Sequence, residues 1–311
     1  MTDPTKPEPE VSVRDVQAWA TEPARPGLVS VVIPVFDGAA FLLEALESVR
    51  AQRYPHWEVI VVDDGSTDAS GSVARAVAER EPRVRVRSQP NRGHPAARNT
   101  GLVECRGEYL QFLDADDRLC PGKLESQVAF LEMHPEVDIV TGEARYYSAR
   151  GREPTRELAP PLPHSLADLL LRNVMCVDSP LVRRTVLAKT GGFKSRTERG
   201  ERLYGCEDWD LWLRAALAGC RLEYVPDVVV HNYWHGRDAQ HDRVRMLESA
   251  LWVLADNAGG VPFRQRPWWG LSVLEKRLAL WVTRRADGTR AHAALRQLLA
   301  TLCTLRGAAA R

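Results

Sequence analysis

The sequence predicts an α/β fold in which a mainly parallel sheet is flanked by helices and is followed by a helical C-terminal extension. Between residue 28 and about residue 120, short apolar runs rich in β-branched residues alternate with helical patterns. The runs are uniformly apolar, which is typical of strands buried on both faces of a sheet. Residues 239–311, in contrast, show helical patterns only.

The first half of the chain supplies most of the predicted strands. LVSVVIPVF at 28–36 is long enough for a strand, and a helical stripe of apolar residues follows it from Leu42 to Val49. Asp68 or Thr67 is suited to cap the next helix. The other strands are expected at 58–62, 84–87 and 109–113, and the other helices at 69–80 and 94–104.

The pattern is looser beyond residue 113. We expect a Pro-rich loop at 154–163, and Gly191-Gly192 should end a short helix. Further helices are expected at 121–133 and 207–218, and further strands at 137–141, at 177–182 and within 221–230.

Three regions follow from these patterns. Residues 1–27 are polar and Pro-rich and are expected to be a flexible N-terminal tail, with a short helix as an option at 11–20. Residues 28–236 form the predicted α/β domain, and residues 237–311 form the helical C-terminal extension.

The composition limits the classes of partner and location. A net charge of +1 creates no whole-molecule field that would attract nucleic acid. The six cysteines form no CxxC pair, which favours reduced thiols in a cytoplasmic protein. The first residues lack the basic-then-apolar pattern of a signal peptide, and no apolar stretch is long enough to span a bilayer. We therefore expect a cytoplasmic protein, with the inner face of the membrane as the alternative.

Acidic residues gather where the predicted strands end. Asp37 follows the first strand, Asp63-Asp64 the second, and Asp114-Ala115-Asp116-Asp117 the fourth. Ligands of an open parallel sheet bind at this edge, and so many carboxylates would repel one another unless a cation neutralised them. Mg²⁺ or Mn²⁺ would suit them, and such ions are commonly shared with substrate phosphates. Each motif taken alone also fits an ordinary turn or helix cap.

A third acidic pair, Glu207-Asp208, begins the predicted helix EDWDLWLRAAL. The helix dipole stabilises negative charge there, so capping is one explanation. The other explanation is that the apolar residues of the next turns hold a carboxylate in place for general-base work. There is no GxxxxGK[ST] loop and no GxGxxG after the first strand.

These residues together resemble the family 2 glycosyltransferases with the GT-A fold, over residues 28–236. The matching stretches are VSVVIPVFDG at 29–38, VIVVDDGSTD at 59–68, NRGHPAARNTGL at 91–102, YLQFLDADD at 109–117, GGF at 191–193 and EDWDLWLRA at 207–215. The resemblance implies an inverting transfer of sugar from a nucleotide-diphosphate sugar, most often a UDP-sugar, with Mn²⁺ or Mg²⁺ as cofactor. The acceptor would be a hydroxyl of a saccharide, of a lipid-linked molecule or of another compound.

The resemblance also implies roles for individual residues. Asp208 would be the general base, with Glu207 beside it. Asp64 would bind the nucleotide base, Asp116 would bind the metal directly, and Asp114 would contact the ribose or a metal-bound water. The implied contacts to the nucleotide sugar are Pro34, Val35, Asp37, Asp63, Asp64, Arg98 and Asp114, and the implied metal residues are Asp114, Asp116 and His235, with His231 competing for the place of His235.

Two alternative functions are kept open. A nucleotidyltransferase would use a related sheet, but the expected basic Gly-rich loop reads PVFDGAAF here. A non-catalytic protein that binds nucleotide sugars is the other alternative. The basic, Trp-containing segment 260–290 is suited to peripheral membrane contact, while a cap on the α/β domain or a homodimer contact would explain the same pattern.

Overall fold

The computed structural model describes residues 10–148, 154–158, 166–234 and 239–284. Within these residues, nine strands form one sheet. The strands are β1 Arg25–Val35, β2 Trp57–Asp63, β3 Val84–Ser88, β4 Gly107–Phe112, β5 Arg118–Leu119, β6 Ile139–Ser148, β7 Pro154–Leu158, β8 Leu181–Arg183 and β9 Leu222–Trp234.

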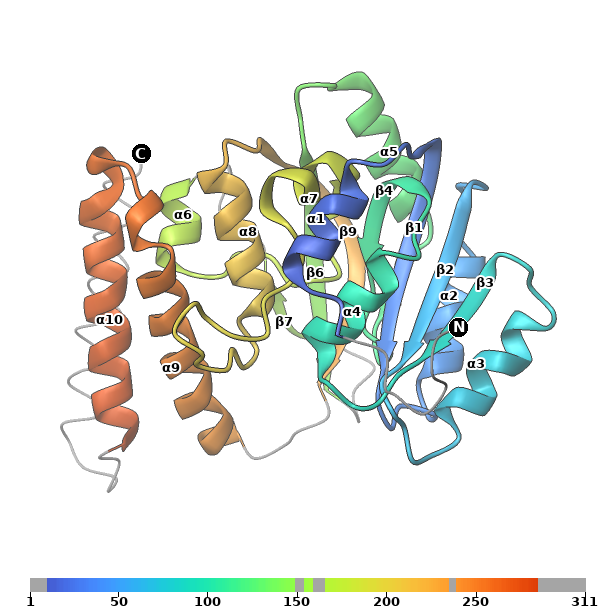
Figure 1. Cartoon of the computed structure of the whole chain (residues 1–311), viewed down its shortest axis with the longest axis horizontal. Helices are drawn as coiled ribbons and strands as arrows, with labels where there is room; N and C mark the ends of the chain where they lie inside the picture. The colour runs from blue at the N-terminus through green and yellow to red at the C-terminus, as the bar shows by residue number, and fades with distance from the viewer. Residues whose placement is uncertain (1–9, 149–153, 159–165, 235–238, 285–311) are drawn as a thin grey trace, which may run out of the picture.

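The sheet is mixed but begins with a parallel half. Its order is β3-β2-β1-β4-β8-β6-β9-β5, with β7 paired to β6 outside this path. Strands β3, β2, β1 and β4 run parallel, whereas β8 runs antiparallel to both β4 and β6. The predicted α/β class and the alternation of strands and helices are therefore confirmed (Figure 1).

Helices cover both faces of this sheet (Figure 1). The α-helices are α1 Val13–Ala20, α2 Leu42–Arg50, α3 Ser70–Ala78, α4 His94–Leu102, α5 Lys123–Met133, α6 Leu166–Leu171, α7 Arg184–Thr190, α8 Glu207–Leu217, α9 Ala239–Asp256 and α10 Arg266–Arg284. Two short 3₁₀ turns, Ala258–Gly260 and Phe263–Gln265, connect the last two helices.

Alternate residues of the central strands enter two separate hydrophobic cores, as the period of a strand requires. Val32 and Ile60 face the core that holds α1, α4, α7 and α8. Val31 and Val59 face the core that holds α2, α3 and α5. Both faces of β1 and β2 are thus buried, which explains why their sequences are apolar without interruption.

Within the expected N-terminal tail, the helix given as an option at 11–20 is present as α1. This helix begins with a capping box in which Ser12 and Asp15 satisfy each other's backbone N–H groups. Val16 and Trp19 are buried in the core, and the Trp19 indole donates to the carbonyl of Cys105 at 3.1 Å. The buried residues of α1, which are Val16, Trp19 and Ala20, therefore make this helix part of the packed domain.

Two expected elements in the second half also differ from the structure. The Pro-rich segment at 154–163 contains strand β7, which pairs antiparallel with β6 and carries Pro154 at its first position, where a strand tolerates proline. The strand expected at 177–182 is shortened to β8, because residues 176–179 form a loop turned by a Ser179 N–H···O bond to Cys176. Strand β9 is one long element in place of several short ones.

The two C-terminal helices pack against each other and lie at the opposite end of the molecule from β3 and α3 (Figure 1). Helix α10 also contacts α6, where Lys276 donates to the carbonyl of Leu171 at 2.8 Å. The Trp269 indole donates to the carbonyl of Leu254 in α9 at 2.9 Å. Among the described helices, none is long and apolar enough to cross a membrane.

Candidate active site

The parallel strands deliver the predicted acids to one edge of the sheet. Val35 and Asp63 are register partners at the ends of β1 and β2, and the Asp64 N–H donates to the Val35 carbonyl at 2.8 Å. Asp37 adopts a φ of 49°, and its carboxylate accepts from the Thr67 N–H at 2.7 Å. Asp37 therefore ties the turn after β1 to the turn after β2.

Asp64 holds a third loop in the same place. Its carboxylate accepts hydrogen bonds from the Gln89 side chain at 2.7 Å, the Arg92 N–H at 2.9 Å and the Gly93 N–H at 2.8 Å. The side chain is 2% exposed. Both oxygens thus bind the loop that leads into α4, and the contact with the nucleotide base that the resemblance implies for Asp64 stays a prediction.

Three other predicted contacts with the nucleotide sugar are buried in the protein. The Val35 side chain is 2% exposed and belongs to the core, and Pro34 is buried beside it. Asp63 is 8% exposed and accepts from the Ser66 N–H at 3.0 Å, which closes the Asp-Gly-Ser turn. Pro34, Val35 and Asp63 therefore support the sheet edge from within the protein.

Arg98 joins two of the acidic clusters. Its guanidinium lies 2.7 Å from Asp114 Oδ1 and 3.0 Å from Glu207 Oε1, while the side chain is only 2% exposed. Burial acts to lower the pKa of Arg98, but the neighbouring carboxylates outweigh it and raise that pKa. The acidic residues therefore do not depend on a metal alone for neutralisation. Arg98 offsets part of the repulsion between them.

A group of three carboxylates, two of them buried, shares Asp114 with this ion pair. One oxygen from each of Asp114, Asp117 and Asp178 falls within 4.8 Å of the others. The Asp114 N–H donates to Asp178 at 2.7 Å, and the Asn232 side chain donates to both Asp117 and Asp178. Burial raises the pKa of Asp178 to about 7, and burial together with the Asp178 charge raises the pKa of Asp117 well above its usual value.

This group fits a hard divalent cation by its chemistry, because all of its donors are carboxylate oxygens. It overlaps only partly with the predicted ligands. Asp114 is in both sets, whereas Asp116 is half-buried in the same loop and is not a member of the three-acid group. His235 lies outside the described residues, and His231 lies on β9, where burial and two nearby arginines lower its pKa.

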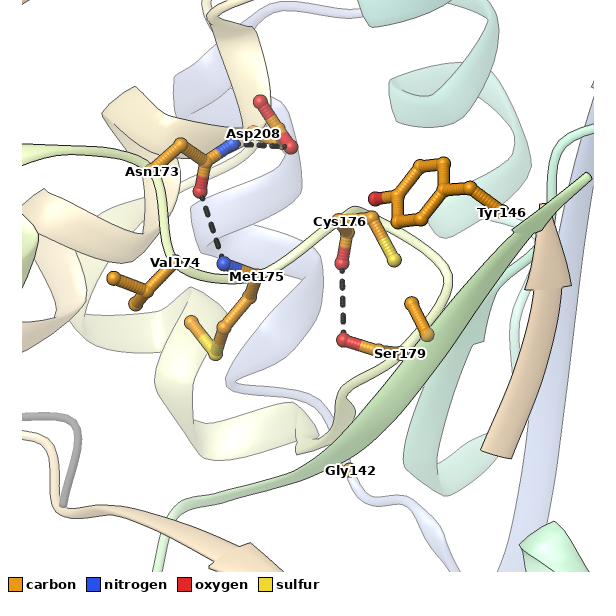
Figure 2. A pocket seen from close by; sticks show the side chains of 9 residues that line it. Gly142, Tyr146, Asn173, Val174, Met175, Cys176, Ser179 and Asp208 are labelled. Atoms are coloured by element: carbon orange, nitrogen blue, oxygen red, sulfur yellow. Dashed lines mark hydrogen bonds between the residues drawn. The ribbon is translucent and has the colours of Figure 1, made fainter. Parts of the chain in front are cut away.

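Asp208 occupies the first turn of α8 beside a pocket (Figure 2). Asn173 donates from Nδ2 to Asp208 Oδ2 at 2.8 Å, and the Trp209 N–H donates to Oδ1 at 2.7 Å. Burial first, and then the charge of Glu207, raise the pKa of Asp208 to about 7. Such a carboxylate is poised to accept a proton near neutral pH.

The pocket has a volume of about 220 Å³. Tyr146 enters it from β6, and its hydroxyl points toward the side on which Asn173 and Asp208 lie (Figure 2). The lining residues are Gly142, Ala144, Tyr146, Asn173, Val174, Met175, Cys176, Ser179 and Asp208.

A hydrogen-bonded frame holds α8 against the loop that follows α7. Asp210 binds Arg214 at 2.7 Å, and Arg214 donates to the carbonyls of Thr190 and Gly192. A Cβ added at Gly192 would lie 2.4 Å from Asn99 Oδ1, so only glycine fits between the loop and α4. The GGF, ARN and EDWDLW stretches are thus parts of one packed unit.

Three residues of this site were missed by the sequence analysis, namely Asn173, Asp178 and Asn232. Asp178 is a single acid within the apolar run VMCVDSP, which favoured a strand and hid the loop. Asn173 and Asn232 stand in no recognisable motif. A polar residue within an apolar run could have indicated a buried functional group, and of these three residues only Asp178 had that signal.

The sequence profile described as glycosyl transferase family 2 matches residues 30–187, about half of the chain. The chain belongs to this family. Residues 30–187 therefore lie in a glycosyltransferase domain of this family, which favours glycosyl transfer over the nucleotidyltransferase alternative. The match includes all the acids at the sheet edge and ends before α8.

Similar proteins are found in several bacteria. The O-antigen biosynthesis protein RfbC of Myxococcus xanthus is 35% identical over 247 residues, which are 73% of this chain and 18% of that protein. The putative glycosyltransferase EpsE of Bacillus subtilis is 31% identical over 199 residues, which are 62% of this chain and 68% of that protein. The aligned region thus spans about a fifth of RfbC, a much longer protein.

Solved structures share the fold. The mannosyltransferase PcManGT from Pyrobaculum calidifontis, in complex with GDP-Man and Mn²⁺, aligns with a TM-score of 0.63 at 23% identity and covers 94% of this chain and 87% of that one. TarS 1–349 from S. aureus, in complex with UDP-GlcNAc, aligns with a TM-score of 0.52 at 19% identity and covers 84% and 88% of the two chains. At these identities the likeness establishes the GT-A architecture.

Proposed function

We propose that this glycosyltransferase moves a sugar from a nucleotide-diphosphate sugar, a UDP-sugar in the first place, to an acceptor hydroxyl with inversion at the anomeric carbon. The observation that carries the proposal is Asp208, a half-buried carboxylate with a raised pKa that borders a pocket and is held by Asn173. Through Glu207 and Arg98 it is linked to Asp114 at the sheet edge.

In the proposed reaction Asp208 accepts the proton of the acceptor hydroxyl. The oxygen then forms a bond to the anomeric carbon as the bond to the diphosphate oxygen breaks, and the nucleoside diphosphate leaves on the opposite side. Asn173 and the Trp209 N–H keep the Asp208 carboxylate in one orientation throughout. A single displacement of this kind inverts the configuration.

The donor would lie along the sheet edge built by Asp37, Asp63 and Asp64. The turns after β1 and β2 and the loop before α4 meet there, which is where an open α/β sheet binds ligands. Asp114 with Asp116, and the neighbouring Asp117 and Asp178, are the residues that would hold Mn²⁺ or Mg²⁺. Such a cation would offset the charge that develops on the departing diphosphate.

A thermal-shift screen tests the donor assignment. We expect UDP and at least one UDP-sugar to raise the melting temperature in the presence of Mn²⁺, and the rise to disappear when EDTA removes the metal. A ligand at a hundred times its dissociation constant stabilises the native state by about 2.7 kcal/mol. GDP-mannose serves as the competing donor, and CMP serves as a nucleotide without a diphosphate. If no nucleoside diphosphate shifts the transition with the metal present, the proposal is wrong.

The rate of transfer should depend on pH through Asp208. Its pKa is raised to about 7, so the carboxylate needed to accept a proton forms only as the pH rises through that value. At saturating donor, kcat should rise about tenfold per pH unit below the pKa and level off above it. The measurement is kcat between about pH 5.5 and pH 8.5. A flat profile across this range would contradict the assignment of the base.

A further inference from the structure

The pocket beside Asp208 is separate from the sheet edge assigned to the donor. It is formed between β6 and the segment 173–176, and Asp208 is the one predicted site residue among its described lining residues. We propose that this pocket is an acceptor subsite that binds one neutral sugar ring and presents a ring hydroxyl to Asp208. The inference rests on the proposed function and names the acceptor class for it.

The size of the pocket limits its occupant to about one ring. Its volume of about 220 Å³ is below the range of roughly 300–1,000 Å³ that is typical of sites for drug-sized ligands. A longer glycan or the rest of a larger acceptor would extend from the pocket into solvent. The subsite therefore selects the sugar at the acceptor end and leaves the remainder of the acceptor unspecified.

The lining has the mixed chemistry that a sugar ring requires. Ala144, Val174 and Met175 provide apolar contacts, and the Tyr146 ring adds an aromatic wall with a hydroxyl at its tip (Figure 2). Asn173 is the amide in this lining and also holds Asp208. A pyranose has apolar C–H faces and hydroxyls at its rim, so both types of lining have a counterpart on it.

The charges in and around the pocket favour a neutral ring over an anionic one. The named lining residues include no lysine or arginine, and Asp208 contributes the carboxylate. Burial raises the pKa of Tyr146, so its hydroxyl remains uncharged near neutral pH. A uronate or a sugar phosphate would place a second negative charge beside Asp208, and the described lining residues offer no cation to compensate it.

Binding of small glycosides to the full chain tests the subsite directly. Saturation-transfer NMR with Mn²⁺, with and without UDP, is run on neutral methyl glycosides of glucose, galactose, mannose and N-acetylglucosamine, and on glucuronate and glucose 6-phosphate. We expect at least one neutral glycoside to bind and both anions to fail. Stronger binding of an anion, or no binding of any neutral glycoside, would overturn the proposal.

Variants place the binding in the pocket. Tyr146→Ala should weaken the glycoside by about tenfold or more, as loss of an aromatic contact does, and Tyr146→Phe should weaken it less because the ring is kept. Val174→Trp should block binding by filling the space from the 173–176 segment. Met133→Ala, at a position 69% exposed on α5, is the control and should leave binding unchanged.

The two proposals fail in different ways. Loss of UDP binding to the unaltered chain would overturn the donor assignment, while the titration without UDP still reports on the pocket. A different result would overturn the subsite alone. In that case UDP binds normally, and neither Tyr146→Ala nor Val174→Trp changes the affinity for the glycoside. Because Val174→Trp changes a partly buried loop residue, it tests the pocket even if Tyr146→Ala fails to fold.

Discussion

Replacing Asp208 with Asn should lower the rate of transfer by about 10²–10⁴-fold, which is the range of a general base, and should leave donor affinity within about twofold. Asn is close in shape to Asp and can still accept the hydrogen bond from Asn173, but it cannot take the acceptor proton. The measurements are kcat with the best acceptor and the dissociation constant of UDP in the presence of Mn²⁺.

The fold of the Asp208→Asn variant should be at least as stable as that of the unaltered chain at pH 8. The pKa of Asp208 is higher in the folded protein, at about 7, than its ordinary value of 3.8. Ionisation therefore destabilises the fold progressively as the pH rises between these values, and an uncharged residue removes that cost.

A matched control and a contradicting outcome complete this test. Glu79→Gln changes an exposed acid at the end of α3, far from the site along the sheet, and should keep normal turnover. An Asp208→Asn enzyme with unchanged kcat would show that another group accepts the proton. Lost UDP binding would instead assign Asp208 to the donor site.

Arg98→Met should reduce the free energy of unfolding by about 3–5 kcal/mol at pH 7.5, because it removes the buried cation that two partly buried carboxylates share. The Asp114 side chain and Glu207 both bind this guanidinium, and Arg98 is 2% exposed. Methionine fills a similar volume, so packing is largely kept. Urea denaturation monitored by Trp fluorescence gives the measurement.

The pH dependence distinguishes lost charge from lost packing in this variant. Burial raises the pKa of Asp114, but Arg98 outweighs it and holds the net value below the usual one. The stabilisation is therefore present above the unfolded pKa of about 4 and is lost as the pH falls through the lower folded value. The deficit of Arg98→Met should therefore shrink as the pH falls below about 4, where Asp114 takes up a proton. A deficit that is constant with pH would mean that only packing was lost.

Two comparisons set the scale for Arg98. Arg98→Lys keeps the charge but lacks the planar fork that reaches two acids at once, so its loss should be smaller but measurable. Arg50→Met removes an exposed pair with Glu47, whose side chains are 46% and 51% exposed, and should change stability by about 1 kcal/mol or less. Equal effects of Arg98→Met and Arg50→Met would contradict the bridging role.

The C-terminal helices contact α8, the helix that carries Asp208. Lys276 of α10 lies 5.3 Å from the ring of Trp209, the residue after Asp208. Asn257, after α9, donates to Asp210 at 3.0 Å, and Asp210 is 1% exposed. These contacts are of the kind expected for a cap on the α/β domain, which was kept as an alternative to membrane contact, and they hold α8, the helix that carries Asp208.

The local sequence pattern was sufficient to predict the parallel half of the sheet and the acidic residues at its edge. Strands β1, β2 and β4 are short apolar runs buried on both faces, and Asp63, Asp64 and Asp114 follow them directly, so strand ends and acids were predictable together. The same holds for Glu207 and Asp208, which begin a helix whose next turns are strongly apolar. Periodicity and turn chemistry act over a few residues, and these features need no more.

Only the tertiary structure decided which groups meet. Arg98 lies between Asp114, 16 residues further along the chain, and Glu207, 109 residues further along, and Asn173 reaches Asp208 from a loop without a motif. Asp178 joins Asp117 in the same way. The α1 helix and β7 depend on partners far along the chain for their burial and pairing. Charge compensation and edge pairing are interactions across space, so the order of residues determined the sheet and its acids, and packing determined how those acids are held.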